Sequence, residues 1–135
     1  MDIAKCKALK AELASHPEPQ IVLLERFFDG NDDEGSIGCN LMEHPGIDAF
    51  RSVFSALSAR GDVKAIYAQI TELDPGDDSW PFTDSVLVVG SISVEDLKLA
   101  LGDLEPDEVG PADSTFPTPG LSEAEKKSAI VVWWD

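Results

Sequence analysis

Hydrophobic residues recur along this chain with two different spacings, and each spacing predicts one kind of element. A repeat every three or four positions is typical of an amphipathic helix. It occurs in 2–15, in 46–60, and after the capping pattern S-V-E-D that begins at Ser93. We therefore expect three helices, the second with Pro45 at its start and Gly61 at its end.

Four segments alternate between apolar and polar residues, or form a short apolar run, which is typical of strands. They are 36–42, 62–73, 85–92 and 129–134. The apolar run 21–28 fits either a strand or a buried helical turn, and Gly30 favours a short helix that ends there. The segment 105–120 is rich in proline, glycine and aspartate and is expected to be irregular.

From Ser36 onward the predicted order is strand, helix, strand, strand, helix, strand. This is the ferredoxin-like β-α-β-β-α-β arrangement of an α+β protein, with both crossover helices on one face of an antiparallel sheet. Residues 1–35 add an N-terminal helical extension and an acidic loop to the 36–135 core, within a single domain, 1–135. The first and last strands are neighbours in this arrangement.

The two middle strands of this predicted sheet are apolar on both of their faces. The face without helices must therefore be covered, either by residues 2–28 or by another subunit.

Charge is the outlying property of the composition. The chain has 26 acidic and 10 basic side chains, which leaves a formal net charge of −16. Such a field repels nucleic acid and anionic lipid, so we expect no nucleic-acid partner and no membrane partner. It favours a basic protein partner, although solubility alone also explains it. The apolar share of 43% excludes a disordered acidic tail.

Two cysteines, Cys6 and Cys39, are too few for a disulfide framework or a four-cysteine zinc site. The N-terminus has no apolar signal core, and no apolar run approaches the roughly 18 residues that span a bilayer. We expect a cytoplasmic protein with reduced thiols. Because Cys39 shares a predicted strand face with Ile37 and Leu41, we expect it to be buried, like Cys6 on its helix.

The sequence contains no pattern that indicates catalysis or a resident cofactor. Cys39 and His44 could form a reactive pair, but a buried thiol accounts better for Cys39. His16 and His44 each precede a proline and lack a second histidine at metal-ligand spacing, so an exposed or capping role is expected. Motifs for phosphate, dinucleotide or zinc binding are absent. We therefore expect no cofactor and assign no catalytic residue.

The stretch FFDGNDDEGSIGCN, residues 27–40, places four carboxylates between two phenylalanines and a predicted strand. Asp29, Asn31 and Asp33 match the first half of a calcium loop, in which oxygens alternate around a hard cation. The second half does not match, because glutamate occupies the glycine position and asparagine the last carboxylate position. Two interpretations stay open, a weak cation site and a solvated turn. In a solvated turn, Asp32 and Asp33 could become asparagine without loss of stability.

Trp133 and Trp134 end the last predicted strand. Adjacent strand residues face opposite ways, so one ring should pack in the core and the other should reach the opposite face. A partly exposed tryptophan rimmed by carboxylates is typical of a binding surface, whereas two covered faces would make both rings core. We expect the acidic loop and the C-terminus to share one end of the molecule. The candidate partner-binding residues are Asp29, Asn31, Asp32, Asp33, Glu34, Trp133, Trp134 and Asp135.

Four strings within residues 20–135 carry a resemblance to a known family: FFDGNDDEGSIGCN, HPG before a helix, WPFTD and VVWWD. They resemble a family of small acidic bacterial proteins whose motifs carry no established chemistry. In size, acidity and α+β order the chain is also similar to immunity proteins that neutralise bacterial toxins. Neither resemblance implies an active-site residue, because fold and composition do not determine function.

The leading hypothesis is a non-enzymatic acidic binding protein, an immunity-type inhibitor of a basic protein partner. Carboxylates would steer the encounter, and a few desolvated aromatic side chains would hold the complex. One alternative is a small-ligand or cation-binding domain that uses the loop at 29–36, and another is an enzyme of unknown class. A homodimer is compatible with the sequence.

Overall fold

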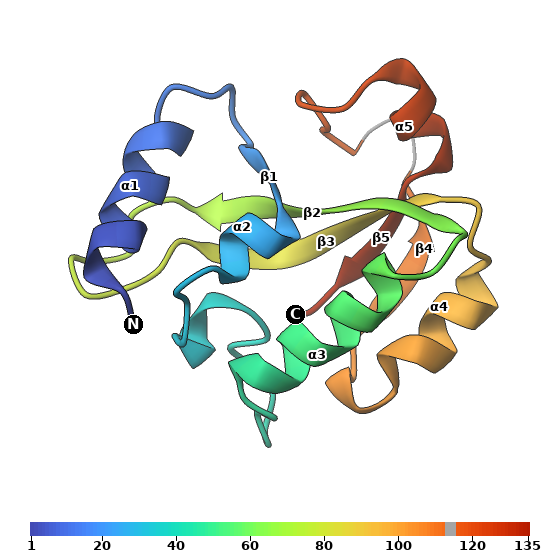
Figure 1. The fold of residues 1–135 in the computed structure, drawn as a ribbon, viewed down its shortest axis with the longest axis horizontal. Coiled ribbons are helices and arrows are strands. Elements are labelled where there is room, and N and C mark those ends of the chain that lie inside the picture. The colour runs from blue at the N-terminus through green and yellow to red at the C-terminus, as the bar shows by residue number, and fades with distance from the viewer. Residues whose placement is uncertain (113–115) are drawn as a thin grey trace.

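The computed structural model spans residues 1–135 and describes all of them except 113–115. Helices and short connecting segments pack around one sheet (Figure 1). In chain order the elements are α1 (Ile3–Leu13), β1 (Ile21–Leu23), α2 (Leu24–Phe28), the 3-10 turn η1 (Glu34–Ser36), α3 (Ile47–Ser58), β2 (Val63–Glu72), β3 (Phe82–Gly90), α4 (Val94–Leu101), the 3-10 turn η2 (Gly102–Leu104), β4 (Glu108–Pro111), α5 (Glu123–Ser128) and β5 (Ile130–Trp133).

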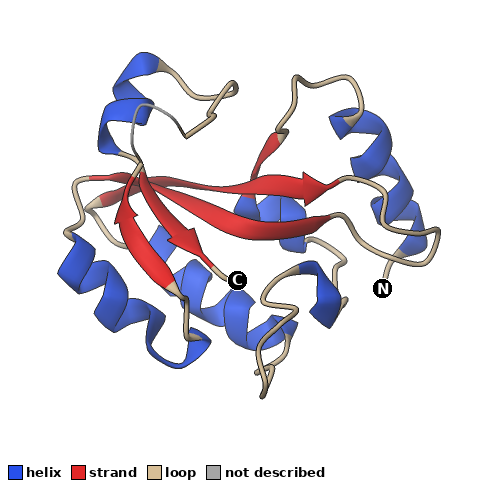
Figure 2. Cartoon of the chain, turned by 180° about the vertical axis from the view of Figure 1, so that it is seen from behind, coloured by secondary structure: helices blue, strands red, loops and turns tan. Residues whose placement is uncertain are grey.

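The strands form an antiparallel sheet in the order β1-β2-β3-β5-β4. β2 and β3 are the long central pair, with Tyr67 opposite Leu87. β5 lies between β3 and β4, so that Val132 is opposite Val86 on one side and Val109 on the other. β1 and β4 are the edge strands. Seen from either side, α3 and α4 lie on the same face of the sheet (Figures 1 and 2).

Each face of the sheet is apolar, and a different part of the chain covers each. Val86 and Val88 of β3 share one cluster of buried residues with α1, α2, α3 and α4. Leu87 and Val89 pack on the opposite face against the segment 116–129, which contains α5. The prediction that the second face needs a cover is confirmed. The covering segment is 116–129, however, whereas residues 2–28 pack mainly on the first face.

The predicted helices are confirmed with small changes at their ends. α1 buries the apolar stripe that contains Cys6, and α3 buries the stripe that contains Phe50 and Phe54. The Ser93 hydroxyl accepts a hydrogen bond from the Asp96 backbone N–H, which caps α4 as its sequence pattern predicts. These features are local, which is why periodicity and capping residues located them.

The predicted strand at 36–42 is wrong. After η1, Ile37 makes one isolated parallel bridge with Thr83, and the chain then turns. Gly38 has a φ of +63°, and a Cβ there would lie 2.9 Å from the Phe50 ring, so glycine permits the turn that interrupts the alternation. The α+β class and the N-terminal helical segment are confirmed. The ferredoxin-like strand order is wrong, because β5 pairs with β3 and β4 rather than with 36–42.

Two short elements also differ from the sequence-based expectation. The run 21–28 is neither strand nor helix alone, because β1 pairs with β2 before α2 begins. The segment 105–120, predicted to be irregular, contains β4. Gly110 and Pro111 are poor strand formers, and β4 exists because it pairs with β5 at the edge of the sheet, where proline is tolerated.

Candidate functional site

Asn31 organises the acidic loop from inside, where it is only 1% exposed. Its side-chain nitrogen donates to the Ser36 hydroxyl at 2.9 Å, and its side-chain oxygen accepts from the Asp33 backbone N–H at 2.8 Å. Its carbonyl accepts from Arg51 of α3 at 2.8 Å. A buried amide that is satisfied on both sides fixes the path of the loop.

The Asp33 carboxylate joins the acidic loop to the turn that precedes β3. One oxygen accepts from the Gly35 backbone N–H at 3.0 Å and caps η1. The other accepts from the Trp80 backbone N–H, also at 3.0 Å. Hydrogen bonds between a carboxylate and backbone N–H groups are strong, so Asp33 has a structural role. The solvated-turn interpretation therefore does not hold for this residue.

Asp29 and Asp32 pair with cations from the N-terminal segment. Lys5 Nζ lies 2.7 Å from Asp29, and the N-terminal ammonium lies 2.7 Å from Asp32. The hydrogen bond from each cation lowers the pKa of the carboxyl that it contacts. Both aspartates are more than half exposed, so these pairs contribute little to the free energy of unfolding.

Glu34 faces His44 without a direct hydrogen bond, since its carboxylate lies 3.7 Å from His44 Nδ1. That nitrogen accepts from the Gly46 backbone N–H at 2.9 Å. The ring hydrogen is therefore on Nε2, which donates to the Ile37 carbonyl at 2.8 Å. His44 thus holds the turn that leads into α3.

The three candidate cation ligands direct their side chains to different partners. Asp29 faces Lys5, Asn31 is enclosed within the loop, and both oxygens of Asp33 accept from backbone N–H groups. Among the residues that the structure describes, no group of three or more His, Cys, Asp or Glu side chains is placed to hold a metal ion.

The two C-terminal tryptophans face opposite sides of the sheet, as their adjacency predicts. Trp134 is buried, its ring centroid lies 5.6 Å from that of Phe50, and its Nε1 donates to the Leu104 carbonyl at 2.8 Å. Trp133 is half-buried on the other face, where it lines a hollow of about 230 Å³ with Phe116. Only Trp133 is therefore available at the surface.

A second set of carboxylates surrounds the end of β5. Cross-strand pairing places Ser85, Trp133 and Glu108 in one row across β3, β5 and β4. The Asp135 backbone N–H donates to the Asp107 carboxylate at 2.6 Å, which fixes the C-terminus beside β4. We name this set the C-terminal acidic edge; it comprises Asp84, Glu105, Asp107, Glu108 and Asp135.

The C-terminal acidic edge differs from the acidic loop in its lack of counter-charges. In the described part of the chain, none of its five side chains forms an ion pair with a basic group. Four of them are exposed, and Asp84 is half-buried. Carboxylates that are close together and uncompensated create a local negative potential that attracts cations.

The structure brings together only part of the predicted binding surface. Asn40 donates to the Asp135 carbonyl at 3.0 Å, so the segment after the acidic loop does lie beside the C-terminus. Asp29, Asp32 and Glu34 are exposed as predicted, whereas Asn31 is buried and Asp33 is half-buried. The acidic loop packs on the face of the sheet opposite Trp133. Glu105, Asp107 and Glu108 were not predicted as site residues, because β4 itself was not predicted.

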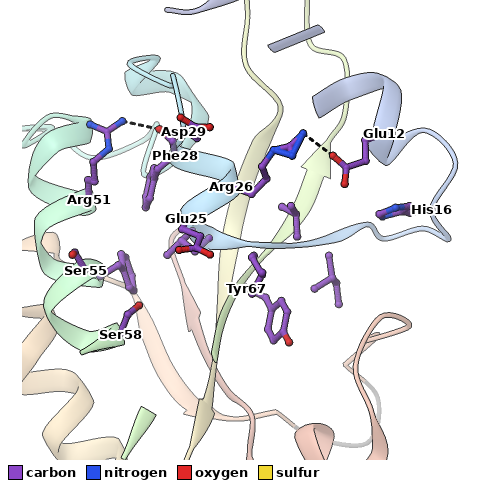
Figure 3. Close-up of a pocket in the computed structure, with 15 residues that line it drawn as sticks. Glu12, His16, Glu25, Arg26, Phe28, Asp29, Arg51, Ser55, Ser58 and Tyr67 are labelled. Carbon is purple, nitrogen blue, oxygen red and sulfur yellow. Dashed lines mark hydrogen bonds and ion pairs between the residues drawn. The ribbon is translucent and has the colours of Figure 1, made fainter. Parts of the chain in front are cut away.

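A groove of about 890 Å³ is lined by polar and apolar side chains from β1, α2 and α3 and from the neighbouring α1 and β2 (Figure 3). Arg51 of α3 donates to the Phe28 carbonyl at 2.7 Å, and Arg26 lies 2.7 Å from Glu12. Charges of both signs meet in this groove, and its two arginines already have partners. Its residues come from five separate elements, so no single sequence motif could have revealed it.

Tyr67 lines the same groove. Its hydroxyl donates to Glu125 of α5 at 2.7 Å, and burial together with this hydrogen bond raises the pKa of Tyr67 to about 12. The tyrosine is therefore neutral at physiological pH and connects β2 to the cover of the second face.

The cysteines occupy different environments. Cys6 is buried, as predicted, and burial raises the pKa of its thiol. The prediction that Cys39 is buried is wrong, because the turn at Gly38 carries it to the surface. Cys39 forms no pair with His44, whose ring nitrogens are both engaged with backbone groups.

The fold and these sites define an α+β protein with an open antiparallel sheet and two acidic regions. The chain belongs to the family described as "Uncharacterized protein YfbO family", whose model matches residues 4–130. It is 31% identical over 121 residues to "Uncharacterized protein YfbO" of Escherichia coli (strain K12), an alignment that covers 88% of this chain and 84% of the relative. No solved structure matches the chain. The predicted resemblance to a bacterial family without an assigned function is confirmed.

No helix among the described residues has the length and apolar character needed to cross a membrane.

Proposed function

We propose that this protein is a non-enzymatic binding protein that inhibits a basic protein partner in the manner of an immunity protein. One observation carries the proposal: the C-terminal acidic edge contains five carboxylates that no basic group in the described structure neutralises. Such a surface attracts a cationic protein over a distance and raises the rate of association. The half-buried ring of Trp133 beside it supplies apolar contact area.

The net charge of −16 does not support the proposal by itself. It does so because the charge that the fold leaves unpaired is concentrated at the C-terminal acidic edge. Many of the other acidic side chains pair with a cation or a backbone donor in the fold, as those of the acidic loop do. An uncompensated cluster raises the free energy of the unbound protein slightly through like-charge repulsion, and a basic partner relieves that repulsion on binding.

The experiment is affinity capture from native lysate, followed by measurement of the association rate with the captured protein. The test variant replaces Glu105 and Glu108 by glutamine and Asp107 and Asp135 by asparagine. A matched control variant makes two glutamine and two asparagine replacements at exposed sites elsewhere, namely Glu43, Glu72, Asp77 and Asp78. Both variants change the net charge equally.

We expect the test variant to associate at least about tenfold more slowly than the wild type at low salt, and the control variant to stay close to the wild type. Salt should slow association and leave dissociation nearly unchanged. Equal association rates for the two variants would contradict the proposal, as would a captured partner that is itself acidic.

A further inference from the structure

β4 is an edge strand, and its open side lies beside a hollow and a set of carboxylates. We propose that β4 (Glu108–Pro111) is the docking edge for an extended basic segment of the partner, which adds to the sheet as a further strand. This inference rests on the proposed function and specifies where, and in which conformation, the basic partner binds.

β4 has the geometry of a preformed template. It pairs with β5 on one side, and no described strand lies on its other side. Its two ends are held, because the Asp107 backbone N–H donates to the Trp133 carbonyl at 2.8 Å and the Ala112 N–H donates to the Ala129 carbonyl at 2.9 Å. A strand that is already ordered loses little conformational entropy when a second strand joins it.

A hollow of about 620 Å³ lies between the end of α4 and the segment 105–110, which leads into β4. It is lined by residues 105–110 together with Lys98 and Gly102 at the end of α4. Glu105, Asp107 and Glu108 face a single basic residue, Lys98, among the residues that line it. The hollow is therefore both open and negatively charged.

The charges select the kind of strand that can occupy this edge. A second copy of the chain would bring the same carboxylates together, and like charges on paired strands are destabilising. An apolar strand would remove the carboxylates from water without a counter-charge, which is costly. A strand that carries lysine or arginine supplies the missing counter-charge. The edge is thus protected against self-association while it stays complementary to a basic segment.

The opposite edge of the sheet is less suitable for this partner. β1 has only three residues and leads directly into α2. The groove beside it contains acidic and basic residues, with Arg26 already paired with Glu12, so it lacks the unopposed negative charge of the β4 edge. The two edges therefore differ in both length and charge, and β4 is favoured on each count.

The main test uses dye-labelled peptides and the wild-type protein, so that its outcome does not depend on the folding of a variant. The parent peptide has about eight residues of alternating lysine and threonine, which suits an extended strand. A second peptide has the same sequence but is N-methylated at two adjacent central residues, which blocks both edges of a strand and leaves the charge unchanged. A third peptide has glutamate in place of lysine. Binding is measured by fluorescence anisotropy at about 20 mM and about 300 mM salt.

We expect the parent peptide to bind at low salt, the N-methylated peptide to bind at least about tenfold more weakly, and the glutamate peptide not to bind. Amide hydrogen exchange of Val109 should become slower in the complex with the parent peptide, because the register of β4 with β5 directs that N–H to the open edge. The four-site test variant at the C-terminal acidic edge should no longer bind the parent peptide, and the control variant should bind it as the wild type does.

The outcomes separate this inference from the proposed function. If the N-methylated peptide binds as tightly as the parent, strand addition is overturned, although attraction of basic partners by the acidic edge stands. If no peptide binds the wild-type protein, the docking edge is likewise overturned. The proposed function is then decided by the association rates of the captured partner alone.

Discussion

The acidic loop and the C-terminal acidic edge contain similar numbers of carboxylates, yet the fold treats them differently. In the loop, Asp29 pairs with Lys5, Asp32 pairs with the N-terminal ammonium, and Asp33 accepts from two backbone N–H groups. At the edge, no carboxylate has a basic partner within the described structure. Both regions are conspicuous for their charge, but only the second leaves that charge uncompensated.

This difference shows that the density of acidic residues does not by itself locate a binding surface. A carboxylate that accepts hydrogen bonds within its own fold helps to hold that fold, and its charge is already balanced locally. A carboxylate without a basic partner, such as that of Glu105 or Glu108, is free to act on another molecule. The comparison can be tested by asking which of the two regions the folded state depends on.

The largest expected effect is in the reactivity of the two cysteines. Cys6 is buried, and its thiol lies 3.5 Å from the Ser79 carbonyl in the turn before β3. Cys39 is exposed. We expect Cys39 to be alkylated at least about 1000-fold faster, because Cys6 must wait for an opening of the structure. Mass spectrometry of the time course measures both rates. Comparable rates would mean that the folded structure does not shield the Cys6 thiol from the reagent.

The next largest effect is expected at Asn31. Replacement by alanine removes the donor to the Ser36 hydroxyl and the acceptor of the Asp33 N–H, which should lower the free energy of unfolding by about 2–3 kcal/mol. Urea unfolding measures the change. Asp32→Ala is the control, since its exposed ion pair should contribute less than about 1 kcal/mol. If the two variants were equally stable, the loop would not be a structural element.

A smaller effect is expected from pH at Asp29 and Asp32. The pKa values of both carboxyls in the folded state lie below the usual value for aspartate. Their contribution is therefore present above that usual value and is lost as the pH falls through the lower folded values. The double variant Asp29→Asn and Asp32→Asn should therefore differ most from the wild type near neutral pH. Thermal melts across an acid series measure this difference, and about 1 M salt should reduce it. A difference that grows on acidification would contradict the assignment.

The smallest effect is expected from the acidic edge. Glu105→Gln combined with Glu108→Gln should leave the free energy of unfolding within about 0.5 kcal/mol of the wild-type value, or raise it slightly, because like charges are removed. The same urea titration measures it. A loss of more than about 1 kcal/mol would show that these carboxylates are structural too, and the contrast between the two regions would disappear.

The parts of the fold that sequence predicted correctly depend on local chemistry. The apolar stripe of α3, the capping serine of α4 and the opposite orientation of the two tryptophans each follow from residues within a few positions. The failures depend on distant residues. At 36–42 the alternation suited a strand, but the turn at Gly38 packs against Phe50, and β4 exists only because of its pairing with β5.

The candidate site was also predicted only in part, because several of its contacts join residues that are distant in the sequence. The sequence identified Asp135 and Trp133 by composition and by their place on the last strand. It could not show that Asp33 is held by the Trp80 backbone, because those residues are 47 positions apart. It also could not show that Glu108 pairs across the sheet with Trp133, since that contact requires β4 to be recognised first.

The place of β5 between β3 and β4 has a consequence for how the chain is made. Synthesis proceeds from the N-terminus, so β4 leaves the ribosome before the strand that separates it from β3. Until β5 follows, β4 has no neighbour and the central strand β3 has an unpaired apolar edge. Such an edge is a site of aggregation. A chain that stops before residue 130 would therefore lose two strand pairings at once, and it would be a substrate for chaperones and proteases rather than a shortened form of the protein.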